Sequence, residues 1–404
     1  MNPINMKPNL SPHCLAIAVA AVITSTLFAG AAEPQFSDVF IAGRDPFKSI
    51  RIPSVVVTKK GAVLAFAEGR AVAADQANNK LILKRSTDGG NTWGALQIIA
   101  DDGENCLNNP CAVMDGKSGR VILMFQSYPS GFSERDGQIL PGLDGPAIVR
   151  NYVIHSDDDG ATWSKMEDVT RTTKHAERVT IMASGPGIGI QLKHGPHAGR
   201  ILMPFNEGPF GHWNVLAVFS DDGGKNWSMG GPPSGCTITN DSGKSISLVN
   251  EVQMVELSDG SVMLNSRKWG GKPLRKTAVS RDGGATWSGI REEPALRDPG
   301  CMASIFGAET QAGQGVLLYS GPDSGGRKNG TVHLSRDDGR TWPVEKVLVP
   351  GSFAYSVLTQ LPGGSMGCLF ETDEATRIVF ARFSLDWLAA DSPAGAAPTP
   401  VLTR

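Results

Sequence analysis

The stretch STDGGNTW, residues 86–93, fits the pattern Ser-x-Asp-x-Gly-x-Thr-Trp, and this pattern sets the architecture of the chain. It recurs as SDDDGATW at 156–163, SRDGGATW at 280–287 and SRDDGRTW at 335–342. A fifth copy, SDDGGKNW at 220–227, has Asn226 in place of the threonine. The copies are spaced at about the length of one blade of a β-propeller with its loops.

Each copy has the chemistry of a tight turn. The Asp side chain accepts hydrogen bonds from backbone N–H groups within the turn, the Gly supplies a positive φ, and the Trp packs the hairpin onto its blade. We therefore assign these residues a structural role. The motif resembles the Asp box of sialidases, and five copies fit the all-β fold that this resemblance implies, a six-bladed β-propeller of four-stranded antiparallel blades in which one blade lacks the motif.

The composition agrees with many short strands. Of 404 residues, 48 are Gly and 26 are Pro, and alternating apolar segments such as SVVVTKKGAVLAFAEGR (54–70) are interrupted by turn dipeptides. The net charge of −2 gives no electrostatic drive toward nucleic acid or an anionic membrane. We therefore expect the protein to bind neither nucleic acid nor an anionic membrane and to have no integral membrane partner. We also expect it to be a monomer.

The two ends of the chain are expected to lie outside the propeller. An apolar run, Leu15 to Phe28, follows Lys7 and precedes the small residues Ala29-Gly30-Ala31, which is typical of a signal peptide at 1–31. An uncleaved anchor is the alternative. We expect a protein that is secreted or periplasmic, with the propeller domain at 32–390 and a disordered tail at 391–404.

Five cysteines follow the apolar run, and only Cys106 and Cys111 are close in sequence. Export is compatible with a disulfide between them, and two reduced, buried thiols are the alternative. No histidine pair or second Cys-x-x-Cys accompanies them, so a metal site is not expected.

Three hairpins place ionisable side chains at matching ends. Glu251 and Arg267 each lie eight residues from the turn near Asp259, so a paired hairpin brings them together. In the same way, Tyr355 and Glu371 lie eight residues either side of Gly363.

The first hairpin of the chain, which turns near Lys60, sets Arg51 opposite residues 68–70. The open ends of the innermost strands of a propeller converge on its axis. We therefore expect the ionisable groups of all three hairpins at one mouth.

The residues around these positions make the chain similar to bacterial exo-α-sialidases with Asp-box repeats, which resemble glycoside hydrolase family 33. FKSIRIPS (47–54) resembles the Arg-Ile-Pro motif that opens the sialidase domain, and AFAEGR (65–70) followed by Asp75 resembles the segment with the acid/base aspartate. The resemblance extends from about Arg44 to Leu388. It also covers three later segments, 250–267, 317–342 and 354–371.

The resemblance implies a role for each site residue. Arg51, Arg267 and Arg327 would clamp the carboxylate of a sialic acid. Tyr355 would be the nucleophile, because a neutral phenol is not repelled by that carboxylate and sialidases are an exception among glycosidases in using Tyr. A phenol has an ordinary pKa of about 10 and needs a base. Glu251 would be the base that takes the phenol proton, and Asp75 would be the acid/base residue. Glu371 would orient Arg51. Arg70 and Asn109 would be possible substrate contacts.

Several residues compete for these roles. Arg275 and Lys268 lie near Arg267, and Arg336 and Arg340 follow Arg327 within a turn motif. Asp75 rests on the resemblance, and the family often has a glycine soon after this Asp, where this chain has QANN (76–79). The segment 105–110 is either a sugar subsite or an inter-blade loop, and Trp213, Trp269 and Phe353 are either sugar contacts or blade packing.

The expected activity is hydrolysis of terminal α-linked sialic acids from glycans, with retention, through a tyrosyl intermediate and with no metal or organic cofactor. Alternatives are a trans-sialidase or an enzyme for a deaminated sugar on the same site. An alternative of another class is a propeller that binds sugar without catalysis.

Overall fold

The computed structural model describes Met1, residues 32–239 and residues 242–390. Apart from Met1, the expected signal peptide and the expected C-terminal tail fall outside the described residues. Within them, none of the helices is long and apolar enough to cross a membrane.

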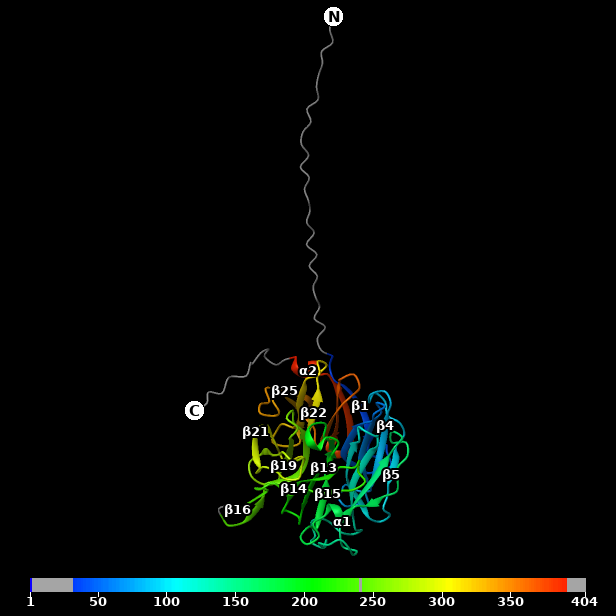
Figure 1. The fold of residues 1–404 in the computed structure, drawn as a ribbon. Coiled ribbons are helices and arrows are strands. Elements are labelled where there is room, and N and C mark those ends of the chain that lie inside the picture. Colours follow the sequence, from blue (N-terminus) through cyan, green and yellow to red (C-terminus); the bar gives the residue numbers. More distant parts are fainter. Residues whose placement is uncertain (2–31, 240–241, 391–404) are drawn as a thin grey trace, which may run out of the picture. The chain divides into compact units, whose positions relative to one another are not determined.

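Six antiparallel sheets form the blades of a six-bladed β-propeller, which confirms the predicted fold (Figure 1). Blade 1 contains β2 (Ser49–Val57), β3 (Val63–Arg70), β4 (Lys80–Ser86) and β5 (Gln97–Ala100). Blade 2 contains β6 (Cys106–Met114), β7 (Val121–Tyr128), β8 (Arg150–Ser156) and β9 (Glu167–Asp168). Blade 4 contains β18 (Val249–Glu256), β19 (Val262–Lys268), β20 (Leu274–Ser280) and β21 (Arg291–Arg297). Blade 5 contains β22 (Ser304–Glu309), β23 (Gly315–Pro322), β24 (Lys328–Ser335) and β25 (Val344–Ser352).

Blade 3 is the irregular one. Its inner edge is shared by β10 (Ile181–Ser184) and β12 (Ile190–Gln191), which both pair with β13 (Ile201–Gly208). Between them β11 (Gly187–Ile188) crosses to pair in parallel with β6 of blade 2. The outer strands are β14 (Asn214–Ser220) and β15 (Ser228–Met229).

Blade 6 closes the ring. It contains β26 (Ser356–Gln360), β27 (Met366–Thr372), β28 (Arg377–Phe383) and, as its outermost strand, β1 (Gln35–Ile41) from the beginning of the propeller. Because β28 and β1 are not joined in sequence, this blade has no turn between its third and fourth strands. It is therefore the blade without the repeated motif.

The five repeats join the third and fourth strands of blades 1 to 5. In the first copy, the Ser86 hydroxyl donates to Asp88 (2.7 Å) and accepts from the backbone N–H of Gly90 (2.8 Å). The ring of Trp93 packs edge-on against Phe380 of the neighbouring blade, with ring centroids 5.5 Å apart. These contacts give the motif the structural role that the sequence predicts.

The strand order separates two faces of the propeller. The repeated turns lie at one face of the propeller. The innermost strand of each blade begins at the opposite face, and the loops that join second to third strands lie at that same face. These loops span 71–79, 129–149, 209–213, 269–273, 323–327 and 373–376. They surround one mouth, which is where the candidate site lies.

The remaining elements are small. A separate hairpin of β16 (Thr237–Thr239) and β17 (Ser245–Ser247) projects between blades 3 and 4 (Figure 1). Short helices are α1 (Thr170–Thr173), η1 (Gly195–His197), η2 (Asp373–Ala375) and α2 (Leu385–Ala389). The five cysteines after the N-terminal apolar run are buried free thiols, so Cys106 and Cys111 form no disulfide.

Candidate active site

A cleft opens at the mouth, with about 790 Å³ of space that includes its open entrance. All predicted catalytic and substrate-binding residues line it. Glu371 does not line the cleft, but its carboxylate accepts a hydrogen bond from Arg51, which does. The lining residues from the prediction are Arg51, Arg70, Asp75, Asn109, Glu251, Arg267, Arg327 and Tyr355.

Glu371 holds Arg51, the contact that the resemblance implies. Glu371 is buried, and its carboxylate accepts from Nη2 of Arg51 (3.0 Å) and from the backbone N–H of Ile52 (2.7 Å). Ile52 has a φ of 61°, and the strand register shifts between Arg51 and Ser54. This local distortion turns the backbone N–H toward Glu371 while the guanidinium faces the cleft. Burial lowers the pKa of Arg51, but Glu371, Tyr355 and Asp75 together outweigh it and raise the pKa overall.

Glu251, Arg267 and Tyr355 form a connected group. The Tyr355 hydroxyl donates a hydrogen bond to Glu251, and Nη1 of Arg267 donates to Tyr355 (2.9 Å) and to Glu251 (2.6 Å). The β18–β19 register shifts between Val249 and Val252, so the pairing that brings Glu251 to Arg267 is a bulge rather than a straight ladder.

Tyr355 is a poor nucleophile without help. Burial, and then the Glu251 carboxylate, raise the pKa of its phenol, and the three arginines only partly offset this. The guanidinium carbons of Arg51 and Arg327 lie 5.0 Å and 5.2 Å from the centre of its ring. A base at Glu251 and cations around the ring are what a reacting phenol needs.

Arg327 completes the group of arginines from the loop of blade 5. It is exposed, and its Nη2 donates a long hydrogen bond of 3.5 Å to the carbonyl of Gly300. No ion pair among the described residues involves Arg327, unlike Arg51 and Arg267. Its guanidinium therefore keeps donors available to an anion in the cleft.

Asp75 lies beside a set of cations. Its carboxylate accepts from Nη1 of Arg70 (3.0 Å), and Nη1 of Arg51 and Nη2 of Arg135 lie 3.7 Å and 3.6 Å away. Burial alone would raise the pKa of Asp75, but Arg70, Arg51 and Arg135 together hold it below the ordinary value. Asp75 is therefore ionised near neutral pH.

The loop of Asp75 is fixed through its backbone. The Asp75 carbonyl accepts from the side-chain amides of Asn79 (2.7 Å) and Asn108 (2.9 Å). The fully buried Glu68 accepts from both of these amides and from the backbone N–H of Asn109 (2.7 Å). Segment 105–110 thus belongs to the site. It starts the inner strand of blade 2 and is not an inter-blade loop.

The sequence did not identify Glu134 and Arg135, which reach the cleft from the long loop of blade 2. Burial, and then the nearby Asp75, raise the pKa of Glu134 to about 7. Arg135 lies over the ring of Phe210, at 4.9 Å from its centre. The predicted strand order could have indicated these two residues, because every loop between the second and third strands of a blade reaches the same mouth.

The aromatic candidates fall into two groups. Trp213 and Trp269 line the cleft, and each contacts Phe210 edge-on at 5.8 Å and 5.5 Å. Phe353 is buried and stacks on Phe370 at 4.9 Å, so it packs the blade.

The competing polar residues lie outside the cleft. Arg275 is buried within blade 4 and pairs with Asp298 at 3.0 Å. Arg336 is exposed within its turn motif on the opposite face.

Residues 61–368 match the family described as BNR repeat-like domain. The chain belongs to this BNR-repeat family. The match spans the last strands of blade 1 to the second strand of blade 6, and so includes Asp75 and the Glu251–Tyr355 pair.

Two proteins that are similar to this chain over most of its length carry the name sialidase. The chain is 36% identical to a sialidase of Micromonospora viridifaciens over 94% of its own length and 59% of that protein. It is 29% identical to a sialidase of Bacteroides fragilis, over 83% of the chain and 62% of that protein. The chain thus spans about three fifths of the length of these two relatives.

A solved structure shares the fold of this BNR-repeat chain. The Hadza microbial sialidase Hz136 superposes with a TM-score of 0.77 at 27% identity, over 88% of this chain and 69% of that one.

Proposed function

We propose that the protein is an exo-α-sialidase, a glycoside hydrolase that releases terminal α-linked sialic acids from glycans. The observation that carries the proposal is the meeting of three arginines with a Tyr–Glu pair in one cleft. The named relatives support it, because they are called sialidases and share most of this chain.

The arginines account for substrate recognition. A sialic acid carries a carboxylate on its anomeric carbon, and guanidinium groups bind carboxylates through charge-assisted, often bidentate hydrogen bonds. Arg51 and Arg267 are already positioned by Glu371 and Glu251, at 3.0 Å and 2.6 Å. Arg327 supplies the donors that are not engaged in an ion pair.

The Tyr–Glu pair accounts for the nucleophile. Glu251 takes the phenol proton as the Tyr355 oxygen attacks the anomeric carbon, and the bond to the leaving oxygen breaks. Water then attacks the same carbon, the bond to Tyr355 breaks, and Glu251 returns the proton to the phenol. Two displacements at one carbon give net retention.

Asp75 serves as the acid in the first step and the base in the second. It must hold a proton to give to the leaving oxygen, whereas its arginine neighbours keep it ionised in the open cleft. A substrate carboxylate beside Arg51 offsets part of that positive charge and raises the pKa of Asp75. Binding of the correct substrate thus favours the protonated acid.

We further propose that the protein is exported and acts as a monomer on sialylated glycans, without nucleic acid or an integral membrane partner. The apolar run at 15–28 and the small residues after it support export.

The test is hydrolysis of a fluorogenic α-sialoside by the wild type, by Tyr355→Phe and by a matched control, Tyr152→Phe, outside the cleft. We expect the first variant to lose at least about a thousandfold in kcat, since it loses covalent catalysis, and the control to keep it. Proton NMR of early product should show the α anomer. A first product of inverted configuration, or full activity of Tyr355→Phe, would overturn the mechanism.

Two further outcomes identify the alternatives. Sialic acid binding without turnover on any linkage would replace the proposal with a sugar-binding propeller. Preferential transfer to an added galactoside would indicate a trans-sialidase.

A further inference from the structure

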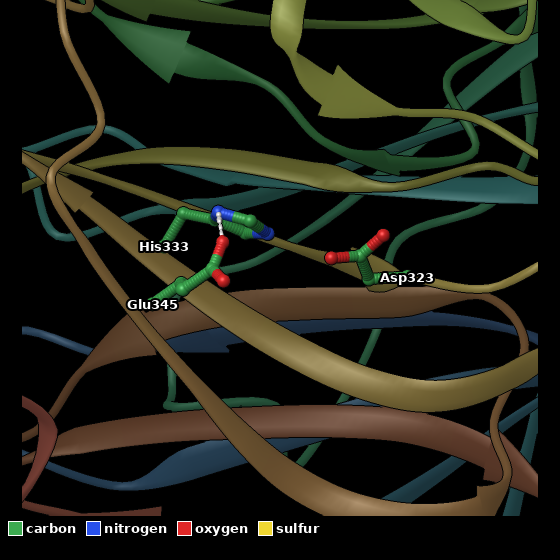
Figure 2. A group of neighbouring side chains, drawn as sticks. All are labelled: Asp323, His333 and Glu345. Carbon is green, nitrogen blue, oxygen red and sulfur yellow. Dashed lines mark ion pairs between the residues drawn. The ribbon is translucent and has the colours of Figure 1, made fainter.

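We propose that Asp323, His333 and Glu345 in blade 5 form a binding site for a divalent transition-metal ion such as Zn²⁺. Asp323 follows β23, His333 lies within β24 and Glu345 lies in β25, directly opposite His333. One potential ligand atom of each residue lies within 4.8 Å of the others. Figure 2 shows the imidazole between the two carboxylates.

His333 is the group that requires a ligand. It is only 2% exposed, and its Nδ1 has no hydrogen-bond partner among the described residues. The nearest anion is Glu345, with an oxygen 3.5 Å from Nδ1 (Figure 2). Tyr319 packs against the ring at 5.6 Å and fixes its orientation. A buried polar atom left without a partner is costly, so this nitrogen is expected to be satisfied by something else.

The valence of the imidazole explains why a proton alone does not satisfy both sides of the ring. A neutral imidazole has one N–H and one lone pair, so it satisfies one carboxylate and presents a lone pair to its other side. A cation bound to the Nδ1 lone pair and to Glu345 satisfies this side of the ring, and the partly exposed Asp323 side chain can turn toward the cation.

The donor set indicates the class of metal. One imidazole nitrogen and two carboxylate oxygens suit Zn²⁺, whereas Ca²⁺ and Mg²⁺ favour oxygen ligands alone. Zinc bonds of about 2.0–2.2 Å place tetrahedral ligands about 3.3–3.6 Å apart, and the His333–Glu345 separation of 3.5 Å already lies in this range. The Asp323 and Glu345 side chains are 33% and 65% exposed, so they can adjust around the fixed ring. A water would take the fourth position.

One cation competes for the site. The Nε of Arg297 lies 3.3 Å from an oxygen of Asp323, and its side chain is 60% exposed. An exposed ion pair of this kind contributes little stability, so Arg297 can turn into solvent when a metal binds.

The position of Asp323 gives the metal a consequence for the cleft. Asp323 begins the loop 323–327 that ends at Arg327, and the backbone N–H of Asp323 donates to the carbonyl of Asn329 (3.0 Å) at the base of this loop. A metal that ties Asp323 to β24 and β25 would restrict this loop and hold Arg327 in place. This consequence, unlike the binding itself, rests on the proposed function.

The binding test uses the full chain, freed of any affinity tag and dialysed against a chelator, and isothermal titration with ZnCl₂ at pH 7.5. We expect one Zn²⁺ per chain in the wild type. Glu345→Gln, which changes an exposed side chain, should bind at least tenfold more weakly, as should His333→Gln. Glu167→Gln changes an exposed carboxylate on the outer strand of another blade and should bind as the wild type does. Absence of stoichiometric binding to the wild type, or unchanged binding by Glu345→Gln, would overturn the site.

The consequence for the cleft is measured separately. Added Zn²⁺ should raise the Tm of the wild type but not that of Glu345→Gln, and should lower KM for a sialoside in the wild type alone. Binding with no effect on KM would retain the metal site and refute its link to Arg327. Lack of sialidase activity in every sample would refute the proposed function and leave the binding result intact.

Discussion

The hydroxyl of Tyr355 donates a hydrogen bond to the carboxylate of Glu251, a residue 104 positions earlier in the chain. Glu251 belongs to the inner strand of blade 4, and Tyr355 immediately precedes the inner strand of blade 6. The pair therefore forms only when blades 4 and 6 are both assembled around the propeller axis. It also defines the proton path that the proposed mechanism requires.

Replacing Glu251 with Gln should lower kcat by about 10²–10⁴, which is the usual contribution of a general base. The amide is similar in size and can still accept from Tyr355, but it takes no proton from it. The measurement is steady-state hydrolysis of a fluorogenic sialoside. Glu256→Gln, at the other end of the same strand and outside the cleft, is the matched control. Equal activity of Glu251→Gln and the wild type would remove Glu251 from the proton path.

Glu371→Gln should destabilise the fold and weaken substrate binding together. The Gln oxygen can still accept from the backbone N–H of Ile52, but Arg51 loses its ion pair. Breaking a buried pair by removing one partner costs about 3–5 kcal/mol, and we expect the lower end because the Arg51 side chain is 15% exposed. Urea unfolding gives the stability. Glu374→Gln, three residues on and exposed, should leave the free energy of unfolding unchanged.

Arg327→Ala should reduce kcat/KM by about ten- to a hundredfold, since a hydrogen bond to a charged group contributes about 1.5–3 kcal/mol. Stability should change little, because Arg327 is exposed and makes one long hydrogen bond. Arg336→Ala removes an equal charge from the opposite face of the propeller. If kcat/KM fell by the same factor in both variants, the effect would come from the change in net charge, and Arg327 would have no direct contact with the substrate.

The fold and the centre of the site were predictable from the sequence because both depend on local patterns. The repeated turns mark five of the six blades, and counting from each hairpin turn brings Glu251 to Arg267 and Tyr355 to Glu371. Pairing across a hairpin is set by the turn, so counting needs no knowledge of the rest of the fold.

The periphery of the cleft was not predictable in this way. Glu134 and Arg135 lie on a loop of 21 residues, 129–149, that no hairpin register constrains. Their place depends on contacts with another blade, such as the one between Arg135 and Phe210. The same holds for the buried support that Glu68 gives to the Asp75 loop, because it arises only when blades 1 and 2 meet.

Glu134 predicts how activity depends on pH near neutrality. Burial, and then the proximity of Asp75, raise its pKa to about 7, so Glu134 is neutral below that pH and ionised above it. Ionisation adds a negative charge to a cleft that binds an anionic sugar. We therefore expect kcat/KM to fall as the pH rises through about 7.

Glu134→Gln removes that ionisation and should flatten the profile, so that kcat/KM at pH 8 rises about three- to tenfold relative to the wild type. The value at pH 5.5 should be nearly unchanged, because Glu134 is already neutral there. Glu104→Gln, an exposed carboxylate before the inner strand of blade 2, is the control for general charge effects. A wild-type profile with no decline between pH 6 and 8, or the same decline in Glu134→Gln, would show that this carboxyl does not control the binding of the anionic substrate.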